Sequence, residues 1–389
     1  MGLDDDGHLP YLRAVSPSAG ETAPRPPRIT VAFLLYNAKG DVEALLQGLV
    51  RQTHPSFPRQ SDWLEAVFVD DASGDGTAEA ATRALAAIGS PSHYRLVVHP
   101  RNLGLAATLN ETLRQVRTSF VLTCHLDCRF GSDGYVAAML GLIESHPRAA
   151  AITGQPQLPP GTRPPFAEQV NVVANLMDIF PADAGKELVP VGFAEGRCDV
   201  FRVEALHQVG LYDTQLRVSG EDQVLAARLR ERGYEIFQAP RLVYRLSVSA
   251  EQDSVAKILR HQRLFGRTTP YIVLKVPGSR GGLVGRNAGA NRNKRVLLRA
   301  TQIAGSAVYA LVPLSLLAGW PGWAWGSGLV FIAAARVALF ARHARAVRFS
   351  PGELLAFVLL QPLLDLAYTA GILEGLLRLA RGGRSVPID

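Results

Sequence analysis

In the stretch AVFVDDASGDGT (Ala66–Thr77), four apolar residues run directly into two carboxylates and a series of small residues. A short, uninterrupted apolar run bounded by turn residues predicts a buried strand, and the helical pattern of Thr77–Ile88 follows at once. A strand, a polar turn and a helix in this order are typical of an α/β sheet with helices on both faces. Asp70 and Asp71 are therefore expected at the carboxyl end of a strand, where such sheets bind their ligands.

The same alternation of strand and helix patterns extends in both directions from this stretch. Further strands are predicted at Ile29–Leu35, Tyr94–Val98, Ser119–Cys124 and Tyr234–Ala239, and further helices at Asp41–Thr53, Leu105–Val116, Tyr135–Ser145 and Val224–Arg232. Strands that alternate with helices predict an α/β fold built on a mostly parallel, twisted sheet. The Pro-rich stretch Gln155–Pro190 breaks this rhythm, and we interpret it as a long excursion over the sheet.

Two more groups of polar residues stand where chemistry is expected. His125 and Asp127 follow the strand Ser119–Cys124, and at this spacing both side chains can project from one turn toward a divalent cation. Carboxylate suits Mg²⁺ or Mn²⁺, and imidazole is tolerated by Mn²⁺. Glu221 and Asp222 open a later helix, where acids are also favourable simply because of the helix dipole. Each group alone fits a solvated turn as well, so the argument depends on their convergence.

The ordered set of motifs resembles the family 2 glycosyltransferases, which have the GT-A fold. The residues that carry this resemblance are, in chain order, Tyr36-Asn37, Gln52-Thr53-His54-Pro55, Asp70–Thr77, Asn102-Leu103-Gly104, His125-Leu126-Asp127, Val209–Asp213, Gly220-Glu221-Asp222 and Gly233-Tyr234. The later residues Arg260-His261-Gln262 and Gly266-Arg267, followed by apolar runs, are similar to succinoglycan-type exopolysaccharide transferases. The resemblance covers about Arg28–Arg267, and it implies a nucleotide-diphospho-sugar transferase fold with C-terminal transmembrane helices.

The resemblance also implies roles for individual residues. Tyr36, Asp70 and Asp71 would bind the nucleotide-sugar donor, Asp127 with His125 would hold Mg²⁺ or Mn²⁺ at the donor, Asp222 would be the catalytic base, and Glu221, Gln262 and Arg263 would lie on the acceptor side. His125 departs from the family, which usually has Asp or Asn there. The implied reaction is an inverting, metal-assisted transfer from a nucleotide-sugar, such as a UDP-sugar, to a lipid-linked or surface-polysaccharide acceptor of the cell envelope.

The net charge of +7 is concentrated in one segment of the chain. Between Ser254 and Gly352 there are fifteen Lys and Arg residues and no Asp or Glu. Such a segment suits nucleic acid or an anionic membrane surface. Three apolar runs favour the membrane over nucleic acid as the partner. They are Thr301–Trp320, Trp323–Ala341 and Leu354–Leu373. The first two are long enough to cross ~30 Å of hydrocarbon as helices. We therefore expect the membrane, and no nucleic acid, as the partner of this segment.

These patterns divide the chain into a disordered tail (1–27), a catalytic domain (28–253), a basic membrane-proximal segment (254–300), a membrane domain of two to three helices (301–380) and a tail (381–389). Basic residues flank the first two runs, which predicts a multi-pass plasma-membrane protein with a cytoplasmic catalytic domain. Arg336 lies near the inner end of the second run and is expected to snorkel. Pro362 and Asp365 favour a re-entrant or interfacial third segment. Three cysteines in a cytoplasmic domain are expected to be reduced thiols.

Other functions stay open at this level. A catalytically weakened donor-binding subunit of a polysaccharide assembly or export complex is one alternative, because His125 replaces an acid. A nucleotidyltransferase with a similar sheet topology is a second, which the block from Gly220 to Tyr234 disfavours. Non-specific nucleic-acid binding is the weakest, because the basic stretch adjoins the apolar runs. Hydrolysis of a nucleotide-sugar donor would separate a transferase from a binding subunit.

Overall fold

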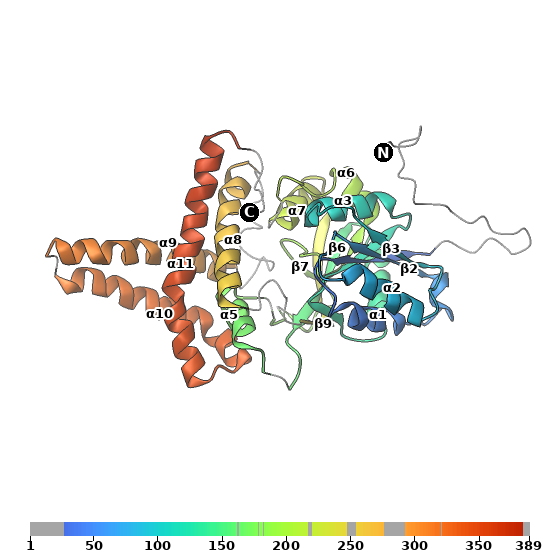
Figure 1. Cartoon of the computed structure of the whole chain (residues 1–389), viewed down its shortest axis with the longest axis horizontal. Coiled ribbons are helices and arrows are strands. Elements are labelled where there is room, and N and C mark those ends of the chain that lie inside the picture. Colours follow the sequence, from blue (N-terminus) through green and yellow to red (C-terminus); the bar gives the residue numbers. More distant parts are fainter. Residues whose placement is uncertain are drawn as a thin grey trace, which may run out of the picture.

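The structure is a computed structural model, which describes residues 27–161, 163–177, 179–181, 183–216, 220–246, 254–275, 292–319 and 321–383. Figure 1 shows an α/β part, which contains the sheet, beside a set of long helices from the C-terminal third. The predicted tail of residues 1–27 lies outside the described residues except for Pro27, as do Arg286 and most of the C-terminal tail.

The sheet of the described residues has nine strands in the order β3-β2-β1-β4-β8-β6-β9-β5, with β7 paired to β9. The strands are β1 (Ile29–Leu35), β2 (Leu64–Asp70), β3 (Tyr94–Val98), β4 (Phe120–Cys124), β5 (Cys128–Phe130), β6 (Ala149–Gln157), β7 (Val189–Pro190), β8 (Cys198–Arg202) and β9 (Glu235–Leu246). The strands β1 to β4 are parallel, whereas β8 runs antiparallel to both β4 and β6. The sheet is therefore mixed. Its first half is parallel as predicted, and β6 and β9 are also parallel to each other, whereas β8, β5 and β7 pair antiparallel.

The reversal of β8 follows from the long excursion after β6. The chain leaves the sheet at the carboxyl end of β6, and it returns to the sheet at that same end with Cys198. A segment that leaves and re-enters at one edge brings the next strand back antiparallel, because a parallel neighbour requires a crossover to the opposite edge. The predicted excursion Gln155–Pro190 is thus real, and it contains a helix of its own, α5 (Phe166–Ala174).

Helices cover both faces of the sheet, as predicted (Figure 1). They are α1 (Val42–Val50), α2 (Thr77–Ala87), α3 (Leu105–Gln115), α4 (Tyr135–Ser145), α6 (Val203–Gln208) and α7 (Glu221–Glu231). All seven residues of β1 are buried, and their side chains alternate between two core clusters. Val31 and Phe33 belong to one cluster, while Ala32 and Leu34 belong to the other. A strand buried on both faces needs a continuous apolar run, which is why this element was predictable.

The helical part consists of α8 (Val255–Lys275), α9 (Arg292–Leu317), α10 (Gly322–Val347) and α11 (Pro351–Ala380). The helices α8 and α11 lie side by side, and the hairpin of α9 and α10 projects away from them (Figure 1). Glycines allow the close approach of α8 and α11. A Cβ atom at Gly266 would collide with the backbone of Tyr368, and one at Gly371 would collide with the backbone of Arg263.

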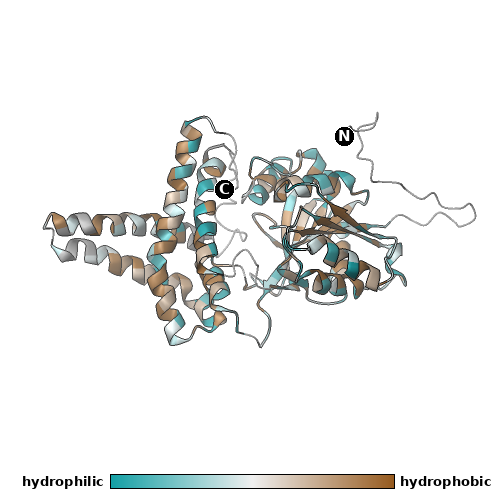
Figure 2. Ribbon diagram, in the orientation of Figure 1, coloured by the Kyte–Doolittle hydropathy of each residue, from teal (hydrophilic) through white to brown (hydrophobic). Residues whose placement is uncertain are grey.

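Two stretches of the described residues are long and apolar enough to cross a membrane, judged by length and composition alone: Gly326–Val347 and Pro351–Ala380. The first predicted run, Thr301–Trp320, contributes only a shorter apolar stretch, Leu297–Val312. Figure 2 shows that the projecting hairpin and α11 are largely hydrophobic. Pro362 does not break α11, which continues through it as one helix of 30 residues. The reason for a re-entrant break is therefore gone.

Arg336 does not snorkel to the end of α10, contrary to the prediction. Its guanidinium donates to Gln361 and to Asp365, each at 2.7 Å, and only 5% of the residue is exposed. The carboxylate of Asp365 is fully buried. Two residues that each looked costly in an apolar helix therefore satisfy one another between α10 and α11. The cost of burying Asp365 was the second argument against placing α11 in the hydrocarbon layer of the membrane, and this pairing removes it.

Candidate active site

Asp71 is held more firmly than any other predicted donor-binding residue. Its Oδ1 atom pairs with the ring Nδ1 of His99 and accepts from the amide of Leu103, and its Oδ2 atom accepts from the amide of Gly104, all at 2.9 Å. The carboxylate thus fastens the Asn102–Gly104 turn, at the start of α3, to the end of β2. Both oxygens of Asp71 are therefore engaged by protein groups, and its carboxylate positions this turn.

The ends of β1 and β2 are locked together by polar side chains. The Asn37 amide donates to the hydroxyl of Ser73 at 2.9 Å, and the Asn37 side chain accepts from the amide of Gly74 at 3.1 Å. The buried carboxylate of Asp70 accepts from the Ser73 hydroxyl, which shapes the same turn. Tyr36 stands next to this turn with 44% of its surface exposed. Its ring is therefore available for stacking on a flat ligand.

Asp127 at the end of β4 is engaged by an arginine that the sequence did not point to. Arg197 donates from Nη1 to Asp127 Oδ2 at 3.0 Å, and its Nε lies 3.0 Å from Glu195 Oε2. The amide of His125 donates to the carbonyl of Arg197 at 2.7 Å, which joins the β4 turn to the turn before β8. The side chains of Asp127 and Arg197 are 15% and 19% exposed. Both predicted cation ligands therefore lie against this arginine.

The electrostatic state of this turn follows from burial and from Arg197. Desolvation alone would raise the pKa of Asp127, but the guanidinium of Arg197 and the ring of His125 outweigh it, so the pKa of Asp127 is lowered. Burial is the main reason why the pKa of His125 is also lowered, and Arg197 adds to this effect. The turn therefore presents an ionised carboxylate and a neutral imidazole at neutral pH.

Glu221, which is buried, and Asp222, which is half-buried, form a pair of acids at the first turn of α7. Burial raises the pKa of Asp222 well above its usual value, and the neighbouring carboxylates of Glu221 and Glu195 raise it further. Burial also raises the pKa of Glu221, to about 7. The amide of Gln223 donates to Asp222 Oδ1 at 2.7 Å and orients the carboxyl group. A carboxylate with a pKa moved toward neutrality is suited to accept a proton from a substrate hydroxyl.

The helices α5 and α8 bring further titratable groups to this site. Burial and the nearby charge of Asp127 raise the pKa of Glu168, on α5, to about 7. Burial and the nearby Arg197 lower the pKa of His261, on α8, to about 4. Ile272 of α8 also contacts Gly220, directly before Glu221, since a Cβ atom there would collide with it. The site is therefore closed on this side by the helices that lead to the apolar hairpin.

Gln262 and Arg263 were predicted on the acceptor side, but their side chains hold helices together. Gln262 is fully buried and donates to Asn175, after α5, at 2.7 Å. Arg263 pairs with Glu374 of α11. Their neighbour His261 lies close enough to Arg197 for that charge to help lower its pKa, and an acceptor-side role for Gln262 and Arg263 stays a prediction. Sequence reasoning missed Arg197, Glu195 and Glu168 altogether, because each reaches the strand ends only through the tertiary fold.

A divalent cation fits this site only if the side chain of Arg197 moves away from Asp127. In the described part of the chain, no group of three or more His, Cys, Asp and Glu side chains is arranged to hold a metal. Asp127 and His125 offer one carboxylate and one imidazole, which suit Mn²⁺, while donor phosphates can supply further oxygen ligands. One oxygen of Asp127 is bonded to Arg197. The two residues can therefore serve as ligands once Arg197 has moved away from that oxygen.

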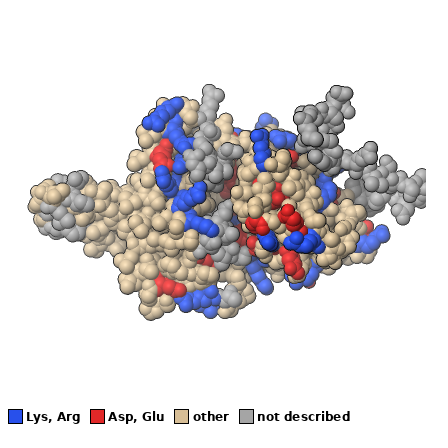
Figure 3. Space-filling model, in the orientation of Figure 1, with Lys and Arg blue, Asp and Glu red and all other residues tan. Residues whose placement is uncertain are grey.

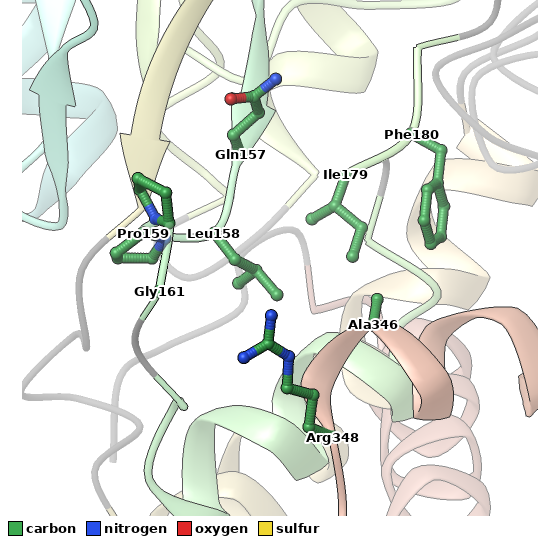
Figure 4. A pocket seen from close by; sticks show the side chains of 9 residues that line it. Gln157, Leu158, Pro159, Gly161, Ile179, Phe180, Ala346 and Arg348 are labelled. Carbon is green, nitrogen blue, oxygen red and sulfur yellow. The ribbon is translucent and has the colours of Figure 1, made fainter.

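A separate pocket of about 280 Å³ lies between the excursion and the end of α10 (Figure 4). It is lined by Gln157, Leu158, Pro159, Pro160, Gly161, Ile179, Phe180, Ala346 and Arg348. Arg342 stacks over the ring of Phe180, 3.8 Å from its centroid, and His343 lies 2.9 Å from the carbonyl of Met177. The excursion is thus docked on the helical part, with the side chain of Arg348 extending toward Leu158.

Comparison with protein families identifies the α/β part. Residues 30–210 match the family Glycosyl transferase family 2. The chain carries a glycosyltransferase domain. The matched range includes the donor-side residues Tyr36, Asp70, Asp71 and Asp127, while Asp222 lies beyond it. A comparison with curated proteins gives no match.

Solved structures give the fold of this glycosyltransferase. It is similar to the mannosyltransferase PcManGT from Pyrobaculum calidifontis in complex with GDP-Man and Mn²⁺, with a TM-score of 0.54, 20% identity, and coverage of 93% of this chain and 90% of that chain. GalNAc-T7 with UDP, GalNAc and Mn²⁺ matches with a TM-score of 0.45 and 13% identity, over 61% of this chain and 47% of that chain. TarS of S. aureus, residues 1–349, matches with a TM-score of 0.42 and 14% identity, over 91% of this chain and 92% of that chain. Only the first similarity exceeds 0.5, and at its identity it supports the GT-A-like fold alone.

Proposed function

We propose that this chain is a membrane-anchored, inverting glycosyltransferase. It transfers a sugar from a nucleotide-sugar, such as a UDP-sugar, to a lipid-linked or surface-polysaccharide acceptor, as the resemblance to succinoglycan-type exopolysaccharide transferases suggests. The observation that supports this proposal is the half-buried carboxyl group of Asp222, whose pKa is raised in part by Glu195, a residue that also contacts Arg197 beside Asp127. A base next to a diphosphate site is what an attack by an acceptor hydroxyl requires.

On the donor side, Tyr36 stacks on the nucleobase, while Asp70 and Asp71 shape the turn that receives the base and ribose. Asp127 and His125 hold Mg²⁺ or Mn²⁺ against the donor diphosphate. When bound, such a cation neutralises the negative charge that develops on the departing nucleoside diphosphate. Asp127 is suited to this role because its pKa is lowered, so its carboxylate is charged at neutral pH.

On the acceptor side, Asp222 accepts the proton of the acceptor hydroxyl as that oxygen attacks the anomeric carbon. Attack from the face opposite the diphosphate inverts the configuration of this carbon. Glu221 lies beside Asp222 and raises its pKa, which strengthens Asp222 as a base. Glu168 and His261 approach from α5 and α8, so the acceptor enters near the helical part. Gln262 and Arg263 act there by holding α8 against α5 and α11.

The direct test is hydrolysis of nucleotide-sugars by the purified full chain in detergent. We expect slow release of nucleoside diphosphate from one member of a panel of UDP-, GDP- and dTDP-sugars, and we expect Mn²⁺ to accelerate it. Chain carrying Asp222→Asn, which still has the donor site, is the matched control for contaminating hydrolases. Failure of every donor to bind, measured by calorimetry, would contradict the proposed function.

A second candidate, a donor-binding subunit without turnover, is favoured by one observation, the bond between Arg197 and Asp127. A permanent pair would leave the cation without its carboxylate ligand. Tight binding of a nucleotide-sugar with no hydrolysis, and no transfer to membrane-derived acceptors, would select this candidate over the transferase.

We also propose how the chain sits in the plasma membrane. The hairpin of α9 and α10 enters the bilayer, and the visible surface of its projecting part shows no charged side chains among the described residues in Figure 3. Lys and Arg instead cluster over α8 and the ends of α11 in this view. Because α11 runs transverse to the hairpin (Figure 1), it lies in the interface with its exposed leucines toward the lipid. These residues are Leu355, Leu359, Leu363, Leu373 and Leu377.

In this arrangement the catalytic domain (28–253) and the end of α11 share the cytoplasmic side, and the membrane domain (301–380) is anchored by the hairpin. Arg342, Arg345 and Arg348 follow the apolar part of α10, and basic segments stay cytoplasmic.

Single cysteines in a variant without Cys124, Cys128 and Cys198 test this topology, since all three native thiols are free and buried. An impermeant maleimide should label Ala318→Cys at the hairpin tip in intact cells. It should label Arg381→Cys, and Ser145→Cys on α4, only after lysis. External labelling of Arg381→Cys would mean that α11 crosses the membrane, and external labelling of Ser145→Cys would contradict the whole arrangement.

A further inference from the structure

Arg197 lies on a turn whose backbone is fixed by hydrogen bonds and whose guanidinium is held by two carboxylates. Gly196, directly before it, has a φ of 75°, and its amide donates at 2.8 Å to Asp199. Asp199 is fully buried and also accepts a hydrogen bond from Thr153 of β6. The guanidinium bonds to Asp127 and Glu195. The main chain thus anchors this residue, while its charged end depends on which anion lies in front of it.

The turn around Arg197 carries an excess of negative charge. Asp127 and Glu195 both contact the guanidinium, so two carboxylates face one cation there. A nucleoside diphosphate cannot approach such a turn favourably without a cation, and a guanidinium matches phosphate oxygens in geometry as well as charge.

We propose that Arg197 is a binding residue for the donor diphosphate, and that it rests on Asp127 when no donor is present. The incoming diphosphate draws the guanidinium away from Asp127. The carboxylate that is released then becomes available to a divalent cation. Binding of nucleotide and binding of cation are therefore coupled through one side chain. This inference rests on the proposed function, because it assumes that a nucleotide-sugar binds at this turn.

The coupling makes the two ligands respond in opposite ways to the loss of Arg197. Without the guanidinium, Asp127 is free in the unliganded protein, so the cation should bind more tightly by itself. The diphosphate loses a charge-assisted partner, so nucleotide should bind more weakly when no metal is present. A purely structural ion pair predicts neither change. Its loss would lower the stability of the turn and weaken both ligands together.

The experiment measures Mn²⁺ and nucleotide binding to full-length chain that has been stripped with EDTA. Free Mn²⁺ is followed by electron paramagnetic resonance, and UDP and GDP binding are followed by calorimetry. Arg197→Met should raise the affinity for Mn²⁺ alone by about tenfold or more. It should lower the metal-free affinity for the nucleotide by about tenfold or more. Arg197→Lys, which keeps the charge, should show smaller changes in both.

Arg95→Met is the matched control, because Arg95 pairs with Glu65 at 3.6 Å at a distance from the strand ends of the site. It should leave both affinities unchanged. Unchanged or weakened Mn²⁺ binding by Arg197→Met and Arg197→Lys would overturn the proposal, and so would tighter Mn²⁺ binding with an unchanged nucleotide affinity. If wild-type chain binds neither UDP nor GDP, with or without Mn²⁺, the proposed function itself fails. In that case the Mn²⁺ titration of the variants still reports whether Arg197 covers Asp127.

Discussion

Asp222→Asn should lower the turnover number by about 10²–10⁴-fold, the usual contribution of a general base. Asparagine keeps the shape of the side chain but cannot accept the proton of the acceptor hydroxyl. The donor-side residues lie on β1, β2 and β4, whereas Asp222 lies on α7, so nucleotide affinity should stay within a few-fold of wild type. Steady-state kinetics with the preferred donor and calorimetry with its nucleoside diphosphate measure the two quantities. Wild-type turnover in this variant would refute the assignment of the base.

The pH dependence of turnover gives this assignment a matched control. Asp222 acts only when deprotonated, so turnover should increase with pH and level off above the raised pKa of Asp222. Glu221→Gln removes a neighbouring negative charge, which lowers the pKa of Asp222. The midpoint of the profile should therefore move to lower pH, while the upper plateau of turnover persists. A midpoint that moves to higher pH, or does not move, would show that the two carboxyl groups do not interact as the structure indicates.

The first half of the sheet was predictable because its strands have a recognisable local sequence pattern. Ile29–Leu35 and Leu64–Asp70 are apolar runs buried on both faces, and each ends at polar residues that mark the carboxyl edge. The strands β6 and β8 carry no such signal. Ala149–Gln157 contains small and polar residues, and Cys198–Arg202 has only five residues. Their positions depend on contacts with β9 and β4, so neither their pairing nor the antiparallel direction of β8 could be deduced locally.

The residues of the candidate site likewise divide into those that local sequence patterns indicate and those that depend on the tertiary fold. Asp71, His125, Asp127 and Asp222 follow strands or open a helix, so the position of each in the sequence already indicated a ligand edge. Arg197 could not be found in this way, because it contacts Asp127 across 70 residues of sequence. The sequence does place it beside a glycine in a turn that leads into a strand, which is a weak signal for a special backbone. What a residue contacts across the fold is decided by packing, and local patterns do not contain that information.

The charged residues within the apolar helices show the same limit of local sequence patterns, which do not reveal contacts across the fold. Arg336 and Asp365 were each judged alone, within the run that contains it, and each then required a separate explanation. The structure makes them partners across 29 residues of sequence. Gly305 of α9 lies against the same carboxylate, since a Cβ atom there would stand 2.8 Å from Asp365 Oδ2. Three helices therefore meet at one buried ion pair, which makes it a position of high sensitivity in the helical part.

Asp365→Leu should destabilise the helical part by roughly 3–5 kcal/mol, because it leaves the guanidinium of Arg336 buried without its counter-ion. Arg336→Met should have a similar effect, since it leaves the Asp365 carboxylate in the same apolar surroundings. The double variant Arg336→Met/Asp365→Leu removes both charges and keeps apolar volume, so it should recover most of the lost stability. Thermal unfolding in detergent micelles measures the stability of all three variants. Arg51→Met is the control: its ion pair with Asp133 is largely exposed, so its loss should leave the melting temperature unchanged. Additive losses in the double variant would show that the two residues do not pair in the bilayer-facing helices. Recovery would show that the two charges are coupled, so that each is costly only when its partner is missing.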